Sequence, residues 1–276
     1  MSFPLGRLGI ALACAFLTLL FLVIGFPYEL VGQRLVNSVN QASGVQLEMD
    51  DLGPYLSLQG PGLQASHVSL KVADGTRWQL NRARIRPAWS TSWFRLEPAI
   101  HLEIDAEMGR IEGTLTTGDT PGFDGVFSDV DLARLPLDAF LPGADFKGIL
   151  NAEIDLQRVD GVVQGLLVLG ATQGLLAGDL FPMPLPFDSL EGEFSFGGDS
   201  MLEVTKFDFQ SPLLTAQLAG SLGMASSFAV APLDLRLELQ PKSGMNKILQ
   251  SAGIRSKRSG KITLRIQGTV ANPKIR

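Results

Sequence analysis

The chain has 276 residues, a formal net charge of −5 and a single cysteine, Cys14. Its length suits one large domain or two small ones. A uniformly basic composition, typical of nucleic-acid-binding proteins, is absent, so we expect no nucleic-acid partner. One cysteine cannot form an intramolecular disulfide, which is compatible with either side of a membrane.

The first distinctive segment is residues 8–26, an uncharged apolar run that reads LGIALACAFLTLLFLVIGF. As a helix it would cover roughly 28 Å, close to the thickness of the hydrocarbon core of a bilayer. Signal peptides have about 7–15 apolar residues before a small-residue cleavage site, and no Ala-x-Ala follows this run. We therefore predict an uncleaved transmembrane anchor within residues 1–27. Its membrane-embedded residues would include Leu8, Ile10, Leu12, Phe16, Leu19, Leu20, Phe21, Leu22, Val23, Ile24 and Phe26.

Charges on either side of this run predict its orientation. Arg7 and the amino terminus precede it, whereas Glu29 follows it closely. The positive-inside rule then places a short tail in the cytoplasm and exports the body of the chain.

Residues 28–44 have the pattern of a short amphipathic helix. Val31, Leu35, Val39 and Ala42 recur at helical spacing, and Gly44 is a suitable stop. From Val45 onwards the apolar period changes to two.

Residues 45–276 are predicted to form one β domain. Alternation is regular in residues 233–239 and 262–266, where aliphatic residues occupy every second position. About a dozen such segments occur with very little helix, which favours antiparallel sheet, because parallel strands need long crossover connections. Residues 162–169 are apolar at both alternating positions, so we expect this strand to be covered on both faces.

Charge is unevenly distributed along this domain. Residues 97–160 contain 14 acidic and 4 basic residues, whereas residues 242–276 contain nine basic residues and no acidic one. Arg82, Arg84 and Arg86 are expected on one solvated strand face, with binding of a partner as the alternative. Two readings remain open for the basic residues near the C-terminal end, namely solvated surface or contact with anionic headgroups or an acidic partner. These residues are Arg255, Lys257, Arg258 and Lys261.

No catalytic motif is found in the sequence. His67 and His101 lie in separate predicted strands, without a spacing that suits a transition metal. We expect no catalytic residue, no metal and no cofactor, and a membrane-tethered hydrolase is the least favoured function.

Three segments carry a family resemblance: the segment from Trp78 to Leu115, with Arg110-Ile-Glu-Gly-Thr-Leu115, the strand from Phe146 to Leu156, and the ending Ile262-Thr-Leu-Arg-Ile-Gln-Gly-Thr-Val-Ala-Asn-Pro273. With the anchor and helix before them, they resemble the AsmA-like form of the type II secretion system protein N family. The resemblance implies a single-pass inner-membrane protein with an elongated, curved antiparallel β-sheet in the periplasm. It also implies contact with the inner membrane and other secretion-system proteins, and no catalytic residues.

Two functions therefore remain open. One is a non-enzymatic component of the type II secretion system, and the other is a periplasmic protein that binds or transfers lipid in envelope homeostasis. The apolar strand positions would form either a groove for phospholipid acyl chains or the core of a closed sandwich. The predicted groove residues are Ile100, Leu102, Ile104, Phe146, Leu150, Ile154, Phe194, Phe196, Leu233, Leu235, Leu237, Ile262, Leu264 and Ile266.

Overall fold

The computed structural model describes residues 17–18, 28–42, 46–71, 77–88, 99–135, 144–178, 183–198, 200–225, 230–242 and 261–275. The protein is mainly β in these ranges and divides into two compact units, Met1–Arg86 and Pro87–Arg276. All the predicted anchor residues lie outside the described ranges. Among the residues that are described, none of the helices combines the length and the hydrophobicity needed to cross a bilayer.

From Tyr28 onwards, the described residues of unit 1 form a helix and a three-stranded antiparallel sheet. Its elements are α2 (Tyr28–Ala42), β1 (Gln46–Ser57), β2 (Gly60–Lys71) and β3 (Arg77–Pro87), and the strands pair in chain order. The predicted helix is confirmed, with Glu29 in its first turn, where a negative charge stabilises the helix dipole. The side chain of Asn40 accepts a hydrogen bond from the Leu47 amide at 2.6 Å, which holds the end of α2 against the start of β1.

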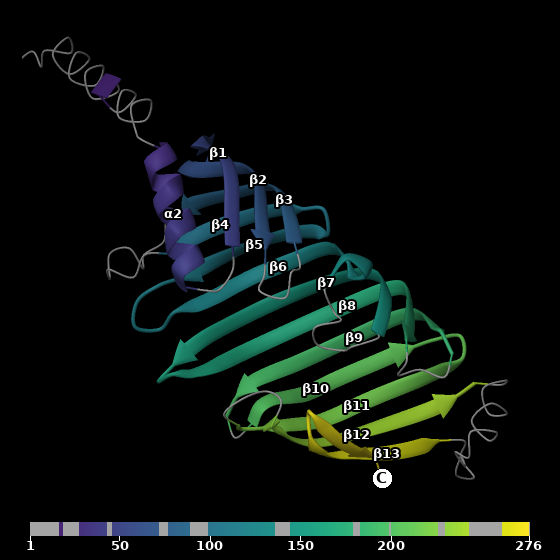
Figure 1. Ribbon diagram of the computed structural model, residues 1–276. Coiled ribbons are helices and arrows are strands. Elements are labelled where there is room, and N and C mark those ends of the chain that lie inside the picture. Colours follow the sequence, from purple (N-terminus) through teal and green to yellow (C-terminus); the bar gives the residue numbers. More distant parts are fainter. Residues whose placement is uncertain are drawn as a thin grey trace, which may run out of the picture. The chain divides into compact units, whose positions relative to one another are not determined.

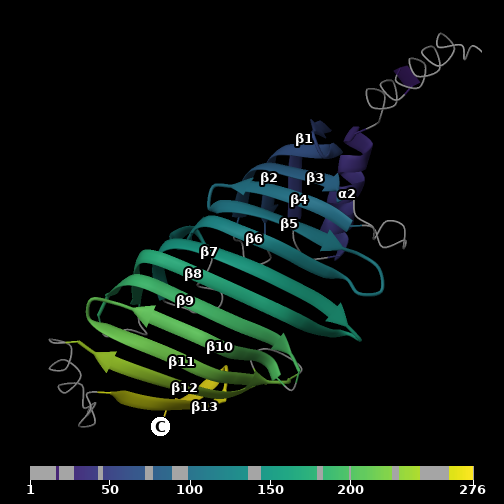
Figure 2. The ribbon, with the colours of Figure 1, turned by 180° about the vertical axis from the view of Figure 1, so that it is seen from behind.

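Unit 2 is an antiparallel sheet whose strands lie side by side in chain order (Figures 1 and 2). Its first strands are β4 (Ala99–Ala106), β5 (Gly109–Thr116), β6 (Gly122–Asp131), β7 (Ala144–Val159), β8 (Val162–Gly178) and β9 (Leu185–Gly197). The sheet continues with β10 (Ser200–Gln210), β11 (Leu214–Gly223), β12 (Pro232–Pro241), β13 (Ile262–Thr269) and β14 (Asn272–Ile275). A short 3-10 helix, η2 (Leu132–Arg134), follows β6.

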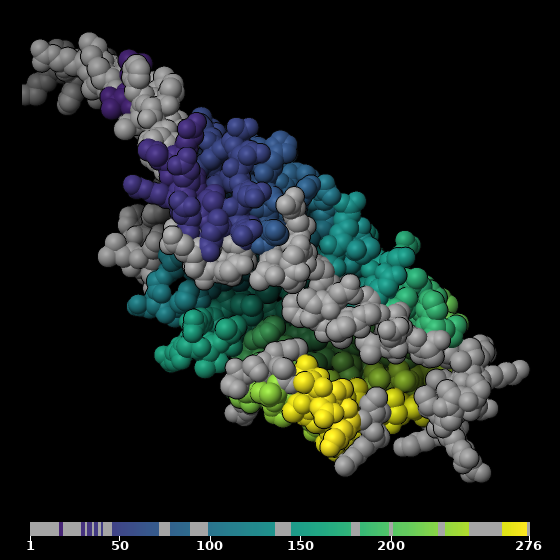
Figure 3. Space-filling model, in the orientation of Figure 1, coloured from purple at the N-terminus to yellow at the C-terminus, as the bar shows by residue number. Residues whose placement is uncertain are grey.

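This sheet is open, because its strand order runs from β4 to β14 without pairing the two ends. The predicted antiparallel sheet is therefore confirmed, and the described strands do not form the closed sandwich that was the alternative. In the space-filling view, the yellow C-terminal strands border a hollow floored by green strands of the same unit (Figure 3).

The expectation that residues 162–169 are covered on both faces is wrong. Val162, Val163, Leu166 and Val168 are each about two-fifths exposed or more. A strand that is apolar at both alternating positions is buried on both faces only where another layer of structure packs on the sheet. In the described part of unit 2 the strand lies in a single-layer sheet, so no second sheet covers either of its faces.

Six buried side chains of unit 2 pack together in one cluster, Ala171, Leu185, Phe187, Phe209, Leu214 and Ala216, and others such as Val130, Val204 and Ile262 are buried outside it. The rings of Phe187 and Phe209 pack at a centroid separation of 5.8 Å, tilted by 50°. Over the rest of the described sheet, most apolar side chains are only half-buried. The cluster therefore stabilises one region of the sheet and leaves most of its apolar face accessible.

Candidate functional site

The strand register gathers the predicted groove residues on one face of unit 2. In the middle of the sheet, Ile154 of β7 pairs with Leu167 of β8, which pairs with Phe194 of β9. Side chains of directly paired residues in an antiparallel sheet point to the same side. These three therefore form one row across three strands.

A second row crosses the C-terminal part of the sheet. Leu218 of β11 pairs with Leu237 of β12, which pairs with Leu264 of β13. On the first strands, Ile104 pairs with Ile111 of β5 in the same manner. The rows connect through intermediate pairs to make one surface, which we call the apolar face.

The apolar face contains all fourteen predicted groove residues, which come from β4, β7, β9, β12 and β13. Ile262 is buried, and the other thirteen are half-buried. These thirteen side chains keep part of their surface accessible. A closed core would instead bury such side chains almost completely.

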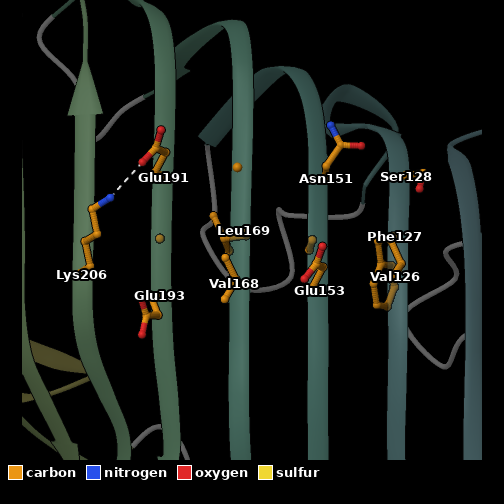
Figure 4. Close-up of a pocket in the computed structure, with 13 residues that line it drawn as sticks. Val126, Phe127, Ser128, Asn151, Glu153, Val168, Leu169, Glu191, Glu193 and Lys206 are labelled. Carbon is orange, nitrogen blue, oxygen red and sulfur yellow. Dashed lines mark hydrogen bonds and ion pairs between the residues drawn. The ribbon is translucent and has the colours of Figure 1, made fainter.

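The opposite face of the sheet carries the charged side chains of these strands, and we call it the polar face, although a few apolar residues such as Val168 are exposed on it. Around β9 and β10, Glu191, Glu193 and Lys206 project into a shallow depression that Asn151 and Glu153 also line (Figure 4). The Lys206 ammonium lies 3.0 Å from Glu191, and the hydrogen bond and charge of that carboxylate raise the pKa of Lys206. The lining contains no histidine or cysteine, so it offers no residue pair for nucleophilic catalysis of the Ser–His or Cys–His kind.

Ion pairs also connect β12 to β13 on the polar face. The Arg265 guanidinium donates to both carboxylate oxygens of Asp234, at 3.0 and 2.9 Å, and this pairing lowers the pKa of Asp234 and raises that of Arg265. Glu238 contacts Lys261 and Arg236, and these contacts, that of Lys261 above all, lower its pKa. Since all of these groups but the half-buried Glu238 are exposed, the pairs fix side-chain positions more than they add stability.

Of the four basic residues near the C-terminal end that the sequence singled out, one lies within the described ranges. Lys261 is described, and its ammonium contacts Glu238 of the neighbouring strand. Arg255, Lys257 and Arg258 lie outside the described residues. Contact of these four with headgroups or a partner stays a prediction.

The expectation of one solvated arginine face on β3 is wrong in part. Arg82 is exposed, but Arg84 and Arg86 are half-buried, while Ile85 is 44% exposed. Arg84 stacks over the ring of Tyr55 at 4.4 Å and donates a hydrogen bond to Gln64 at 2.9 Å. The periodicity of β3 does not reveal these partners, because they come from β1 and β2.

One group of side chains near the start of unit 2 has the composition of a metal site. The possible ligand atoms of His101, Glu103 and Glu112 lie within 4.8 Å of one another, and the buried Nε2 of His101 has no hydrogen-bond partner. Glu112 also lies 3.8 Å from Arg110. Sequence spacing did not predict the group, because the pairing of Glu103 with Glu112 across β4 and β5 creates it. A His–Glu–Glu set suits a zinc ion with an open position, but pairing of polar residues across two strands also produces such a group without a metal.

Comparison with known proteins adds no relative, since no family model, curated protein or solved structure matches the chain. The candidate site therefore rests on the geometry of the apolar face.

Proposed function

We propose that this protein is a non-enzymatic component of the bacterial envelope that binds phospholipid acyl chains on the apolar face of unit 2. One observation carries this proposal: the half-buried aliphatic and aromatic side chains are contiguous from β4 to β13 and lie on an open sheet. Extended apolar surfaces of this kind are unusual in soluble monomers unless they bind something.

The dimensions of the face suit acyl chains. Nine strand spacings separate β4 from β13, and at about 4.8 Å each they amount to roughly 43 Å. One leaflet of a bilayer contributes about half of its ~30 Å hydrocarbon core, so an extended acyl chain covers roughly 15 Å. The face is therefore long enough for more than one chain.

The chemistry of the face also favours a hydrocarbon ligand. The backbone donors and acceptors of interior strands are used in the sheet, and the fourteen groove side chains carry no hydrogen-bonding group. A polar ligand would lose hydrogen bonds to water there without replacing them. An acyl chain has no such bonds to lose.

The resemblance in sequence favours a location and a cellular role for the same protein. The resembling segment Ile262–Pro273 spans β13 and the start of β14, at one end of the sheet. On this basis we place the protein in the inner membrane, with most of the chain in the periplasm, as part of the type II secretion system. Secretion genes beside its own gene would support this role, and an isolated gene would favour lipid homeostasis. The two roles are compatible.

Native mass spectrometry of the full chain, extracted from membranes in mild detergent, tests lipid binding. We expect bound phospholipid in the wild type and several-fold less in Ile154→Asp, whose charge would lie in the path of an acyl chain. Circular dichroism should show both proteins folded, because the half-buried position lets the new carboxylate reach water.

The matched control is Leu166→Asp, on the polar face of the adjacent strand, opposite Asp155 and Ser195. This variant should retain its lipid. Absence of lipid from the wild type, or unfolding of Ile154→Asp, would show instead that the face is core.

A further inference from the structure

The β1–β2 hairpin of unit 1 ends in two outward-facing leucines. Leu56 is 74% exposed and Leu58 is fully exposed. The turn is well ordered, because the Ser57 hydroxyl donates to the Gly60 carbonyl at 3.0 Å and accepts from the Gln59 amide at 3.2 Å. A structured turn therefore presents these leucines to the surroundings.

This hairpin also lacks charge over a long stretch. No aspartate, glutamate, lysine or arginine occurs between Asp51 and Lys71. Hairpin turns in water are normally rich in polar residues. A charge-free tip with exposed leucines can enter an apolar medium without desolvating an ion.

The tip lies toward the end of unit 1 where α2 begins. Asn40, near the end of α2, contacts Leu47 at the start of β1, while Gly32 packs near Leu52 further along the strand. The helix therefore runs antiparallel to β1. Figure 1 shows the two elements beside each other.

Toward the end of unit 1 where α2 begins, the hairpin tip extends further than the first residue of the helix. Six residues of extended chain from Leu52 to Leu58 cover roughly 20 Å, whereas the four helical residues from Gly32 back to Tyr28 cover about 6 Å. The predicted membrane anchor, residues 8–26, joins the chain just before Tyr28.

Residues below the tip suit the boundary between water and lipid. Tyr55 precedes Leu56, and the Arg84 guanidinium lies over its ring. Tyrosine is enriched where membrane proteins meet the headgroups, and arginine can keep its charge at that level while its stem contacts apolar groups. Ile85, also partly exposed, is the next residue after Arg84.

We propose that the hairpin tip, Leu56 to Leu58, inserts into the surface of the bilayer that holds the anchor. This proposal rests on the membrane attachment in the proposed function, but not on lipid binding by the apolar face. The tip would give unit 1 a second point of attachment and fix its orientation at the membrane.

Fluorescence of the full chain in liposomes tests the insertion. Leu58→Cys, made in a Cys14→Ala background and labelled with an environment-sensitive dye, is reconstituted into phosphatidylethanolamine–phosphatidylglycerol vesicles. We expect a blue-shifted emission, several-fold stronger quenching by lipid-borne nitroxides than at the control position, and weaker quenching by aqueous iodide.

The control is Val162→Cys in the same background, an exposed apolar position on the polar face at the β7–β8 turn of unit 2. Flotation of the vesicles reports attachment, and native mass spectrometry separately reports lipid on the apolar face. If the chain floats with the vesicles but iodide quenches the dye at position 58 as strongly as the dye at position 162, the insertion alone is overturned. Failure of the chain to float would overturn both the attachment and the insertion.

Discussion

Phenylalanines in unit 2 experience two different environments on the same sheet. Phe209 is 5% exposed and packs against Phe187 in the buried cluster. Phe194 lies on the apolar face and is half-buried, with one side accessible. Removing a ring leaves a cavity only where other atoms surround it.

We therefore expect unequal losses of stability from the same substitution. Phe209→Ala should lower the free energy of unfolding by about 3–5 kcal/mol, whereas Phe194→Ala should lower it by roughly half of that or less. Urea unfolding followed by circular dichroism measures both. Equal losses would mean that the apolar face is covered in solution.

For individual residues, the sequence predicted which face of the sheet a side chain occupies but not which side chains it contacts on neighbouring strands. Alternation correctly assigned Ile154 and Phe194 to one face, because a strand's period of two fixes which side each residue faces. The contact of Arg84 with Tyr55 and the group around His101 depend on which residues lie opposite each other across strands. That register is a tertiary property, which one strand's sequence does not contain.

Two of the four glycines in strand β8, Gly165 and Gly170, have different roles. Gly165 has a φ of +146°, and an added Cβ would clash with the Asp155 carbonyl oxygen of β7. At Gly170 the nearest atom to an added Cβ, the Leu190 carbonyl oxygen, lies 3.9 Å away. The first glycine allows close approach of two strands, while the second merely leaves space on the polar face.

Replacing each glycine with alanine should separate these roles. Gly165→Ala should lower the free energy of unfolding by about 1–3 kcal/mol, because it combines backbone strain with a steric clash. Gly170→Ala should change it little. The midpoints of urea unfolding provide the comparison, and matching midpoints would contradict this account of the β7–β8 pairing.

At the level of elements, the sequence predicted whether a segment is helix or strand better than it predicted which strand faces other residues bury. The helix from Tyr28 and the antiparallel strands were predicted because their apolar periods differ clearly. The exposure of Val162 and Val168 was not, because periodicity shows which face is apolar but not whether another layer packs on it. The same limitation applies to Leu56 and Leu58 at the hairpin tip.

For the whole molecule, the proposed function combines a membrane attachment with an accessible apolar sheet. The anchor and most of the basic residues near the C-terminal end remain predictions from sequence, since they lie outside the described ranges. The open sheet of unit 2 and its apolar face come from the structure. The central claim is that acyl chains occupy this face in the cell.

Photo-crosslinking in intact cells tests that claim most directly. A photoreactive amino acid replaces Ile154, on the apolar face, or its neighbour Glu153, on the polar face, and mass spectrometry of the irradiated full chain identifies the adducts. We predict phospholipid adducts at position 154 and few or none at position 153. No lipid adduct at position 154, adducts only with protein, or equal lipid labelling at both positions would contradict the account.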